Sequence, residues 1–295
     1  MADKKLSFAI FGNDRKALEL MQVWEMLDYL SKRNADVFIE ETFYRNLCRD
    51  LNGDLPVAGV FEGNSFETDY AISLGGDGTF LRAASKVGAK NIPIIGVNMG
   101  RLGFLANVLP GEVLEMLDEI YGGNFDIEER SVIKLSTDSE KFRDYPFALN
   151  DIAILKRDTA SMISIRVSVG GEYVVTYLAD GLIISTPTGS TAYSLSNGGP
   201  IMVPRSGILS LTPVAPHSLN IRPIVIGDDM EIKLEVESRS HSFLAAIDGR
   251  SERVDEGTTV TIAKAPFRIR IVKRHNHRYF STLRSKLMWG ADSRE

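Results

Sequence analysis

A glycine-rich segment with a single carboxylate carries the sharpest chemical signal in the chain. It reads Leu74-Gly75-Gly76-Asp77-Gly78-Thr79 and links a predicted buried strand to a predicted helix. Glycines at such a turn let backbone N–H groups approach a phosphate closely, and the helix N-terminus adds about half a positive charge. Asp77 would repel a phosphate unless it serves a metal or accepts a proton from an attacking hydroxyl. The segment therefore predicts phosphate chemistry, and a tight turn capped by Asp77 is the purely structural alternative.

Neither common phosphate-binding motif fits this loop. The chain contains no Gly-Lys dipeptide, which excludes a Walker A loop, and Gly76-x-Gly78 lacks the third glycine of the dinucleotide motif. The four histidines include no helical i, i+4 pair, so a zinc site is not indicated. The single cysteine, Cys48, has no evident histidine partner and is interpreted as structural.

Three further segments combine polar residue types that suit a nucleotide. Asn98 to Leu105 follows a predicted strand end, where open α/β sheets bind ligands, and Phe104 could wall an adenine pocket. Asn150-Asp151 offers an amide beside a carboxylate, which suits ribose hydroxyls or an adenine edge. Gly189 to Ser196 is rich in Ser, Thr and Tyr and carries no charge, which suits hydrogen bonding and stacking with a dinucleotide. Ordinary loops are the structural alternative in all three places.

Asp180 lies in a nearly apolar stretch, where a buried carboxylate needs hydrogen-bond donors. The donor could come from a ligand amide or a neighbouring subunit, and a simple turn aspartate is the alternative.

The segment Gly75–Thr79 resembles the GGDGT signature shared by NAD kinases, diacylglycerol and sphingosine kinases and, more loosely, 6-phosphofructokinases. The ordered set of the other segments, Asn98 to Leu105, Leu149 to Asp151 and Asp180 to Ser194, narrows the resemblance to bacterial NAD kinases. That family usually carries Glu after the Asn, where this chain has Asp151, and many relatives carry Gln in place of Arg250.

The resemblance implies a reaction and a set of site residues. The reaction is transfer of the γ-phosphoryl group of ATP, with Mg²⁺, to the 2′-hydroxyl of the adenosine ribose of NAD, with Asp77 as general base and no metal ligand assigned to the protein. It also implies NAD and ATP as substrates and a homotetramer or homodimer. The implied substrate- and nucleotide-binding residues are Gly75, Gly76, Gly78, Thr79, Arg82, Asn98, Phe104, Asn150, Asp151, Asp180, Thr188, Thr191, Ala192, Tyr193, Ser194, Leu195, Ser196, Ala215 and Arg250.

The elements that position these residues divide into two parts. Up to about residue 125, short apolar runs such as Ser7 to Phe11 alternate with helical periodicity, which predicts an α/β domain with a Rossmann-like, mostly parallel open sheet. In Lys16 to Ser31 the expected buried face is Leu20, Val23, Trp24, Leu27 and Leu30.

Alternating segments such as Ile163 to Val169, followed by a Gly170-Gly171 turn, then predict an all-β, sandwich-like domain. We expect the α/β domain to span 1–125 with 275–295 and the β-rich NAD-binding domain to span 126–274. A final helix, Tyr279 to Trp289, is expected to return to the first domain.

Composition limits the other possibilities. The 295 residues are 44% hydrophobic and 25% charged with a net charge of −5, which fits a folded globular protein and no general nucleic-acid binder. The cytoplasm is the expected compartment, because the chain has one cysteine and Met1 to Lys16 makes a poor signal peptide. The uncharged stretch Gly181 to Pro204 is rich in Gly and Pro, so we do not expect it to span a membrane. The basic run from Lys264 to Arg278 is interpreted as a solvated strand face, or alternatively a phosphate-attracting rim. A diacylglycerol-type lipid kinase and a non-catalytic dinucleotide sensor remain alternative functions.

Overall fold

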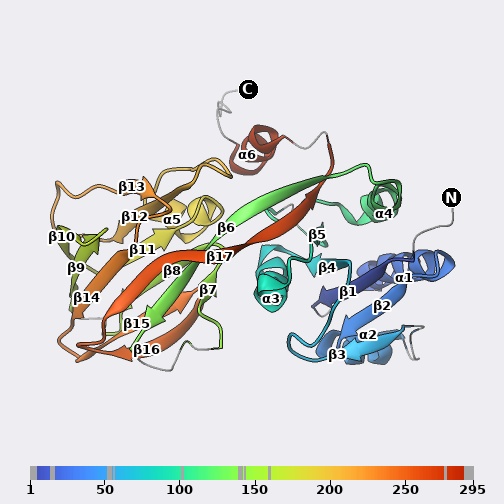
Figure 1. The fold of residues 1–295 in the computed structure, drawn as a ribbon, viewed down its shortest axis with the longest axis horizontal. Helices are drawn as coiled ribbons and strands as arrows, with labels where there is room; N and C mark the ends of the chain where they lie inside the picture. Colours follow the sequence, from blue (N-terminus) through green and yellow to red (C-terminus); the bar gives the residue numbers. More distant parts are fainter. Residues whose placement is uncertain are drawn as a thin grey trace. The chain divides into compact units, whose positions relative to one another are not determined.

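The protein divides into two compact units, residues Met1–Glu129 with Ile269–Glu295 and residues Arg130–Arg268 (Figure 1). This computed structural model describes residues 5–13, 17–51, 55, 57–100, 103–138, 142, 144–158, 161–275 and 278–288. Strands β6 (Asp126–Thr137) and β17 (Val260–Lys273) run from one unit into the other. Within the described part of the chain, no helix combines the length and the apolar character that a membrane span needs.

A parallel sheet forms the centre of the first unit. Its strands, in spatial order, are β3 (Gly59–Phe61), β2 (Asp36–Glu40), β1 (Ser7–Gly12), β4 (Tyr70–Gly75) and β5 (Ile94–Asn98). All neighbouring pairs are parallel. The strand order changes direction between β1 and β4, and open α/β sheets bind ligands at the carboxyl ends of the strands on either side of such a point. The Gly75–Thr79 loop leaves the sheet there, at the carboxyl end of β4.

Helices cover this sheet and bury one face each. They are α1 (Ala17–Lys32), α2 (Glu41–Leu51), α3 (Asp77–Val87) and α4 (Val113–Gly122). The same unit also contains α6 (Tyr279–Leu287). The face predicted for α1 is wrong at one position, because the Trp24 side chain is 46% exposed while Met26 is buried. Residues 23, 26, 27 and 30 follow the i, i+3, i+4, i+7 spacing of a single stripe, and Trp24 lies one position outside it.

The ends of the chain elements follow their local sequence. Pro110 opens a 3₁₀ turn, Pro110–Glu112, ahead of α4, and Gly123 ends the helix with a φ of 69° in the left-handed region. Another 3₁₀ turn, Gly88–Lys90, follows α3. The prediction of a C-terminal helix in the first unit is confirmed by α6, whose Leu283 is buried. Trp289, placed in that helix by the sequence, lies outside the described residues.

The second unit contains two antiparallel sheets. One runs β10 (Glu172–Ala179), β9 (Ile163–Val169), β14 (Ile232–Glu237) and β17. The other runs β13 (Ile224–Gly227), β12 (Ile208–Val214), β11 (Gly181–Ser185), β8 (Asp151–Lys156), β15 (Ser242–Ile247) and β16 (Arg250–Asp255), and a short β7 (Phe147–Ala148) pairs with β6.

The core of the second unit is shared between its sheets. Ile165 and Val167 of β9 belong to one buried cluster with Ile154 of β8 and Leu182 of β11. The helical elements among the described residues of this unit are short: a 3₁₀ turn, Gly189–Thr191, and α5 (Tyr193–Ser196). The predicted fold class, an α/β domain followed by a β-rich sandwich-like domain, is therefore confirmed.

Candidate active site

The three glycines of the Gly75–Thr79 loop are required for different reasons. A Cβ on Gly75 would lie 2.2 Å from Thr79 Oγ1 and 2.5 Å from Thr79 Cβ, so this glycine allows the first turn of α3 to pack on the end of β4. A Cβ on Gly76 or Gly78 would meet no protein atom within 4 Å, and both residues are exposed. The protein's own packing leaves the backbone open at these two positions, as a phosphate site at a helix N-terminus needs.

Asp77 occupies the first turn of α3, and its carboxylate is held by a second loop. Its Oδ2 accepts a hydrogen bond from the Phe104 N–H at 2.9 Å, and its Oδ1 accepts from the Leu105 and Ala106 N–H groups at 3.1 Å each. Successive backbone N–H groups form an anion-binding concavity, and here the anion is a side chain. An ionised carboxylate has about four acceptor positions. Three are used, so the carboxylate is fixed in place and one position remains for a ligand hydroxyl.

Gly103 makes that contact possible. A Cβ at this position would lie 1.9 Å from Asp77 Oδ1 and 2.7 Å from Asp77 Cγ. The Gly103 N–H donates to the Ala106 carbonyl at 3.1 Å, which curls the loop around the carboxylate. The sequence indicated that this loop faces a ligand but not that it holds Asp77. Arg101 and Leu102, part of the same motif, lie outside the described residues.

Two predicted binding residues of the first unit have internal partners in this structure. Asn98 is fully buried, and its side chain accepts from the Gly100 N–H at 2.8 Å and donates to the Ala106 carbonyl at 3.3 Å. Arg82 on α3 donates to the Gly12 carbonyl at 2.5 Å and to Asn13 Oδ1 at 2.9 Å. Arg82 also lines a cavity of about 380 Å³ at the carboxyl ends of β1 and β2.

In the second unit, Asp248 holds the turn that carries Asn150 and Asp151. Its carboxylate accepts from the N–H groups of Leu149 and Asn150 at 2.8 Å each and of Asp151 at 3.1 Å. Asp248 itself has a φ of 47°, in the left-handed region, and its N–H donates to the Asp151 carbonyl at 3.1 Å. Burial raises the pKa of Asp248, while these three N–H groups oppose that shift. Asp248 therefore fixes this turn through hydrogen bonds to its backbone N–H groups and to the Asp151 carbonyl.

Asp151 lies next to this clamp with its side chain 6% exposed. Burial, and then the negative charge of Asp248, raise the pKa of Asp151 to about 7. A carboxyl group in such a place binds a hydroxyl or amide well because it has lost its water shell. The sequence placed Asn150 and Asp151 together as a binding pair but gave no sign that Asp248 holds them, because the two segments are about a hundred residues apart.

The Thr188 to Ser196 segment has an inner and an outer side. Thr188 and Ser194 are buried, with the Thr188 hydroxyl accepting from Arg130 at 3.2 Å and the Ser194 hydroxyl 3.0 Å from that of Thr212. Tyr193 and Ser196 are exposed, whereas Thr191, Ala192 and Leu195 are half-buried. A Cβ on Gly189 would lie 2.2 Å from the Asn150 carbonyl oxygen, so this glycine brings the segment against the Asn150 turn. The two predicted binding segments of the second unit thus meet.

The remaining predicted residues lie near these segments or on the surface. The Asp180 carboxylate pairs with the Lys156 ammonium at 2.7 Å, so the donor expected from a ligand or a second subunit is supplied by the neighbouring strand β8. Ala215 is exposed with a φ of 44°. Arg250 is exposed, and its guanidinium lies 5.3 Å from the centre of the Tyr145 ring.

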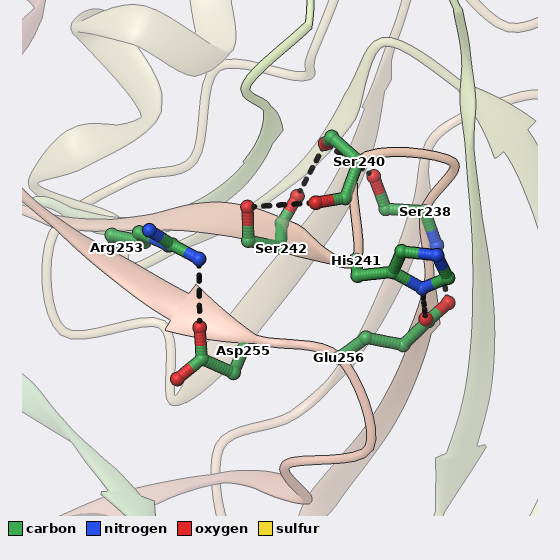
Figure 2. A network of polar contacts seen from close by, with 7 residues as sticks. All are labelled: Ser238, Ser240, His241, Ser242, Arg253, Asp255 and Glu256. Atoms are coloured by element: carbon green, nitrogen blue, oxygen red, sulfur yellow. Dashed lines mark hydrogen bonds and ion pairs between the residues drawn. The ribbon is translucent and has the colours of Figure 1, made fainter.

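The histidines and the basic run are engaged elsewhere. His241 Nδ1 lies 2.7 Å from Glu256 Oε2 in a network at the β14–β15 connection that contains none of the predicted site residues (Figure 2). His275 pairs with Asp126 at 3.0 Å, and His277 lies outside the described residues. Lys264 pairs with Asp228 at 2.8 Å and Arg274 with Glu119 at 2.8 Å. Across the described ranges, no three His, Cys, Asp or Glu side chains gather as a metal site would require.

A glycine loop at the carboxyl end of a parallel strand, with a fixed carboxylate in its helix turn, defines a phosphotransferase type of site. The model of the ATP-NAD kinase N-terminal domain matches residues 8–125, and that of the C-terminal domain matches residues 149–274. The chain belongs to the ATP-NAD kinase family.

Individual relatives agree with this assignment. The chain is 55% identical to an NAD kinase of Bacteroides fragilis over 289 residues, covering 98% of this chain and 100% of the relative. It is 42% identical to an NAD kinase of Porphyromonas gingivalis over 283 residues, covering 96% and 98%. Together with the family models, these full-length matches support an NAD-phosphorylating enzyme.

Two solved structures are similar in fold. An NAD kinase from Archaeoglobus fulgidus in complex with ATP matches with a TM-score of 0.71 and 26% identity, covering 96% of this chain and 99% of that one. Yeast NADH kinase complexed with NADH matches with a TM-score of 0.88 and 21% identity, covering 98% and 89%. The second match concerns the fold alone.

Proposed function

We propose that the protein transfers the γ-phosphoryl group of ATP to the 2′-hydroxyl of the adenosine ribose of NAD, giving NADP and ADP, with Asp77 as general base. The bond between the ribose O2′ and the γ-phosphorus forms, the bond from that phosphorus to the β,γ-bridging oxygen breaks, and Asp77 takes the hydroxyl proton. The observation that carries the proposal is the fixed Asp77 carboxylate, which has one acceptor position left beside two exposed glycines.

The Gly75–Thr79 loop contributes by holding the donor phosphates. Gly76 and Gly78 leave the backbone accessible, and no side chain caps the N-terminus of α3, where the first N–H groups precede the intrahelical hydrogen bonds. Phosphoryl transfer passes through a loose transition state, so most of the catalysis comes from positioning and charge stabilisation. A positioned general base adds about 10² to 10⁴ in rate, or roughly 3 to 5 kcal/mol.

Magnesium fits this loop as a companion of the donor phosphates. Mg²⁺ usually keeps several waters and binds through one or two carboxylates plus substrate phosphates, without a protein cage. The Gly75–Thr79 loop would hold the ion through the phosphates, and the ion would neutralise charge that develops on their oxygens.

NAD recognition is assigned to the second unit. The proposed contacts are the Asn150-Asp151 turn and the outward residues Thr191, Ala192, Tyr193 and Ser196, with Ala215 and Arg250 as further candidates. The proposed functional domains are the α/β domain, residues 1–125 with 275–295, and the β-rich NAD-binding domain, residues 126–274. The support is the Asp248 clamp, which fixes the turn before any ligand arrives.

A homodimer or homotetramer in the cytoplasm completes the proposal. Strand β10 is at the edge of its sheet, and Tyr173, Val174 and Leu178 on it are exposed, as a subunit interface would require. The single cysteine suits a reducing compartment. Light scattering of the purified protein measures the assembly, and a monomer at micromolar concentration would overturn that part.

The decisive test is product formation by the purified protein. We expect NADP and ADP in equal amounts from NAD, ATP and Mg²⁺, with the new phosphate assigned to the 2′ position by ³¹P and proton NMR. Chelating the metal should abolish the reaction. Diacylglycerol as acceptor tests the lipid kinase alternative, and NADP binding without turnover would favour a sensor. Folded protein that forms no NADP would overturn the proposed function.

A further inference from the structure

Helix α6 places a lysine beside the Asp77 loop. The Lys286 ammonium lies 5.4 Å from the centre of the Phe104 ring, within the range of a cation–π contact. The N–H of the same Phe104 donates to Asp77 Oδ2 at 2.9 Å. Lys286 and the Asp77 carboxylate are therefore linked through a single residue, although about two hundred positions separate them in the chain.

The electrostatic environment of Lys286 is unusual for a lysine on the last turn of a helix. Its side chain is half-buried, and among the described residues no acidic side chain forms an ion pair with it. Burial lowers the pKa of its ammonium, and the negative charge of Asp77 opposes that shift. An ammonium that has lost part of its water without gaining an ion pair is stabilised when an anion binds next to it.

Asp77 does not need Lys286 for its own stabilisation, because three backbone N–H groups already hold the carboxylate. The anion that matches the positive charge of the Lys286 ammonium is a phosphate at the exposed backbone of Gly76 and Gly78. Lysine is a compact cation that binds phosphate oxygens as a point charge. We propose that Lys286 binds a phosphate oxygen of the nucleotide donor at the Gly75–Thr79 loop and is positioned for this by the Phe104 ring. This inference rests on the proposed function, which places the donor at the same loop.

A matched lysine distinguishes ligand binding from simple packing. Lys90 lies 5.3 Å from the centre of the Phe66 ring in the same unit, so it makes a contact of nearly the same geometry. Lys90 is exposed, and it follows the far end of α3, away from the first turn that carries Asp77. If Lys286 did no more than make a cation–π contact, removing the charge of Lys286 or that of Lys90 would change the binding of an ATP analogue by a similar, small amount.

The test uses the full-length protein with Lys286→Gln, Lys286→Met and Lys286→Arg, and Lys90→Gln as control. Binding of a non-hydrolysable ATP analogue is measured by titration calorimetry, and the KM values for ATP and NAD are measured separately. Losing a charge-assisted contact should weaken analogue binding and raise the KM for ATP by about tenfold in the Gln and Met variants. Lys286→Arg should retain most of the affinity, and Lys90→Gln should stay within about twofold of the wild type.

The outcomes separate this inference from the proposed function. If the wild type forms no NADP but the analogue binds and weakens in Lys286→Gln, the proposed function fails and the lysine assignment stands. Analogue binding and KM for ATP that stay within about twofold in both charge-removing variants would overturn the inference. A change confined to the KM for NAD would also overturn it, because the cation would then serve the acceptor. Melting temperatures identify any variant that fails to fold, and the Met variant retains the apolar contact with Phe104.

Discussion

Substituting Gly103 by alanine tests whether the loop around Asp77 is part of the catalytic apparatus. The added Cβ would lie 1.9 Å from Asp77 Oδ1, whereas real Cβ contacts stay above 3.0 Å, so the carboxylate or the loop must move by about 1 Å. At least one of the three N–H bonds to the carboxylate is then lost, at a cost of about 1.5 to 3 kcal/mol. A misplacement of this size lowers catalysis by up to about 10²-fold.

The assay for Gly103→Ala couples NADP formation to an NADP-specific dehydrogenase. We expect kcat to fall by about 10²-fold while the dissociation constant for NAD changes by less than about threefold, since Gly103 belongs to the first unit and the proposed NAD contacts belong to the second. Gly111→Ala is the matched control, because a Cβ at Gly111 meets no atom within 4 Å. A folded Gly103→Ala variant with kcat within about twofold of the wild type would refute the reasoning that this contact fixes the base.

Four other substitutions test the remaining parts of the account. Folding raises the pKa of Asp151 from 3.8 to about 7, so between these two pH values the folded state binds more protons than the unfolded state. The free energy of unfolding of the wild type should therefore fall as the pH rises through this interval. Asp151→Asn has no such proton to lose, so its free energy of unfolding in urea should rise relative to that of the wild type by up to about 1.4 kcal/mol per pH unit. Asp248→Ala leaves three backbone N–H groups without their acceptor and should lower the free energy of unfolding by about 3 kcal/mol or more, with weaker NAD binding by calorimetry. Gly75→Ala should destabilise the fold by about 1 to 3 kcal/mol because of the clash with Thr79, whereas Gly76→Ala should leave unfolding within about 0.5 kcal/mol and raise the KM for ATP. Equal effects of the last two variants on stability, or a pH-independent difference for Asp151→Asn, would contradict these expectations.

The sequence was sufficient for the sheet and for the strand-to-helix turn at Gly75–Thr79. Buried strands such as Ser7–Gly12 are short apolar runs that alternate with helical patterns, and tertiary packing had no reason to override them. The Gly75–Thr79 loop was recognisable because a carboxylate among glycines has few structural uses. Trp24 was assigned to the wrong face because a tryptophan is counted as apolar by pattern, while its neighbour Met26 completes the stripe with better spacing.

The partners of the key carboxylates could not be predicted in the same way. Asp180 pairs with Lys156 because the antiparallel register of β8 and β11 sets Leu155 opposite Gly181, and a register is invisible in a single sequence. The N–H groups that hold Asp77 belong to the backbone, which carries no residue-type signal at all. Gly103 was the single hint, since a glycine in that loop indicates a close approach without naming what approaches.

The central claim, that Asp77 is the general base, is tested most directly by measuring kcat and the dissociation constant for NAD in Asp77→Asn beside the wild type. The amide keeps the shape of the side chain but cannot take the proton. Its NH₂ group would also face backbone N–H groups that donate hydrogen bonds to the carboxylate in the wild type. We predict that kcat falls by at least about 10²-fold while NAD binding changes by less than about threefold. Equal losses in turnover and NAD affinity, or a kcat close to that of the wild type, would contradict the account.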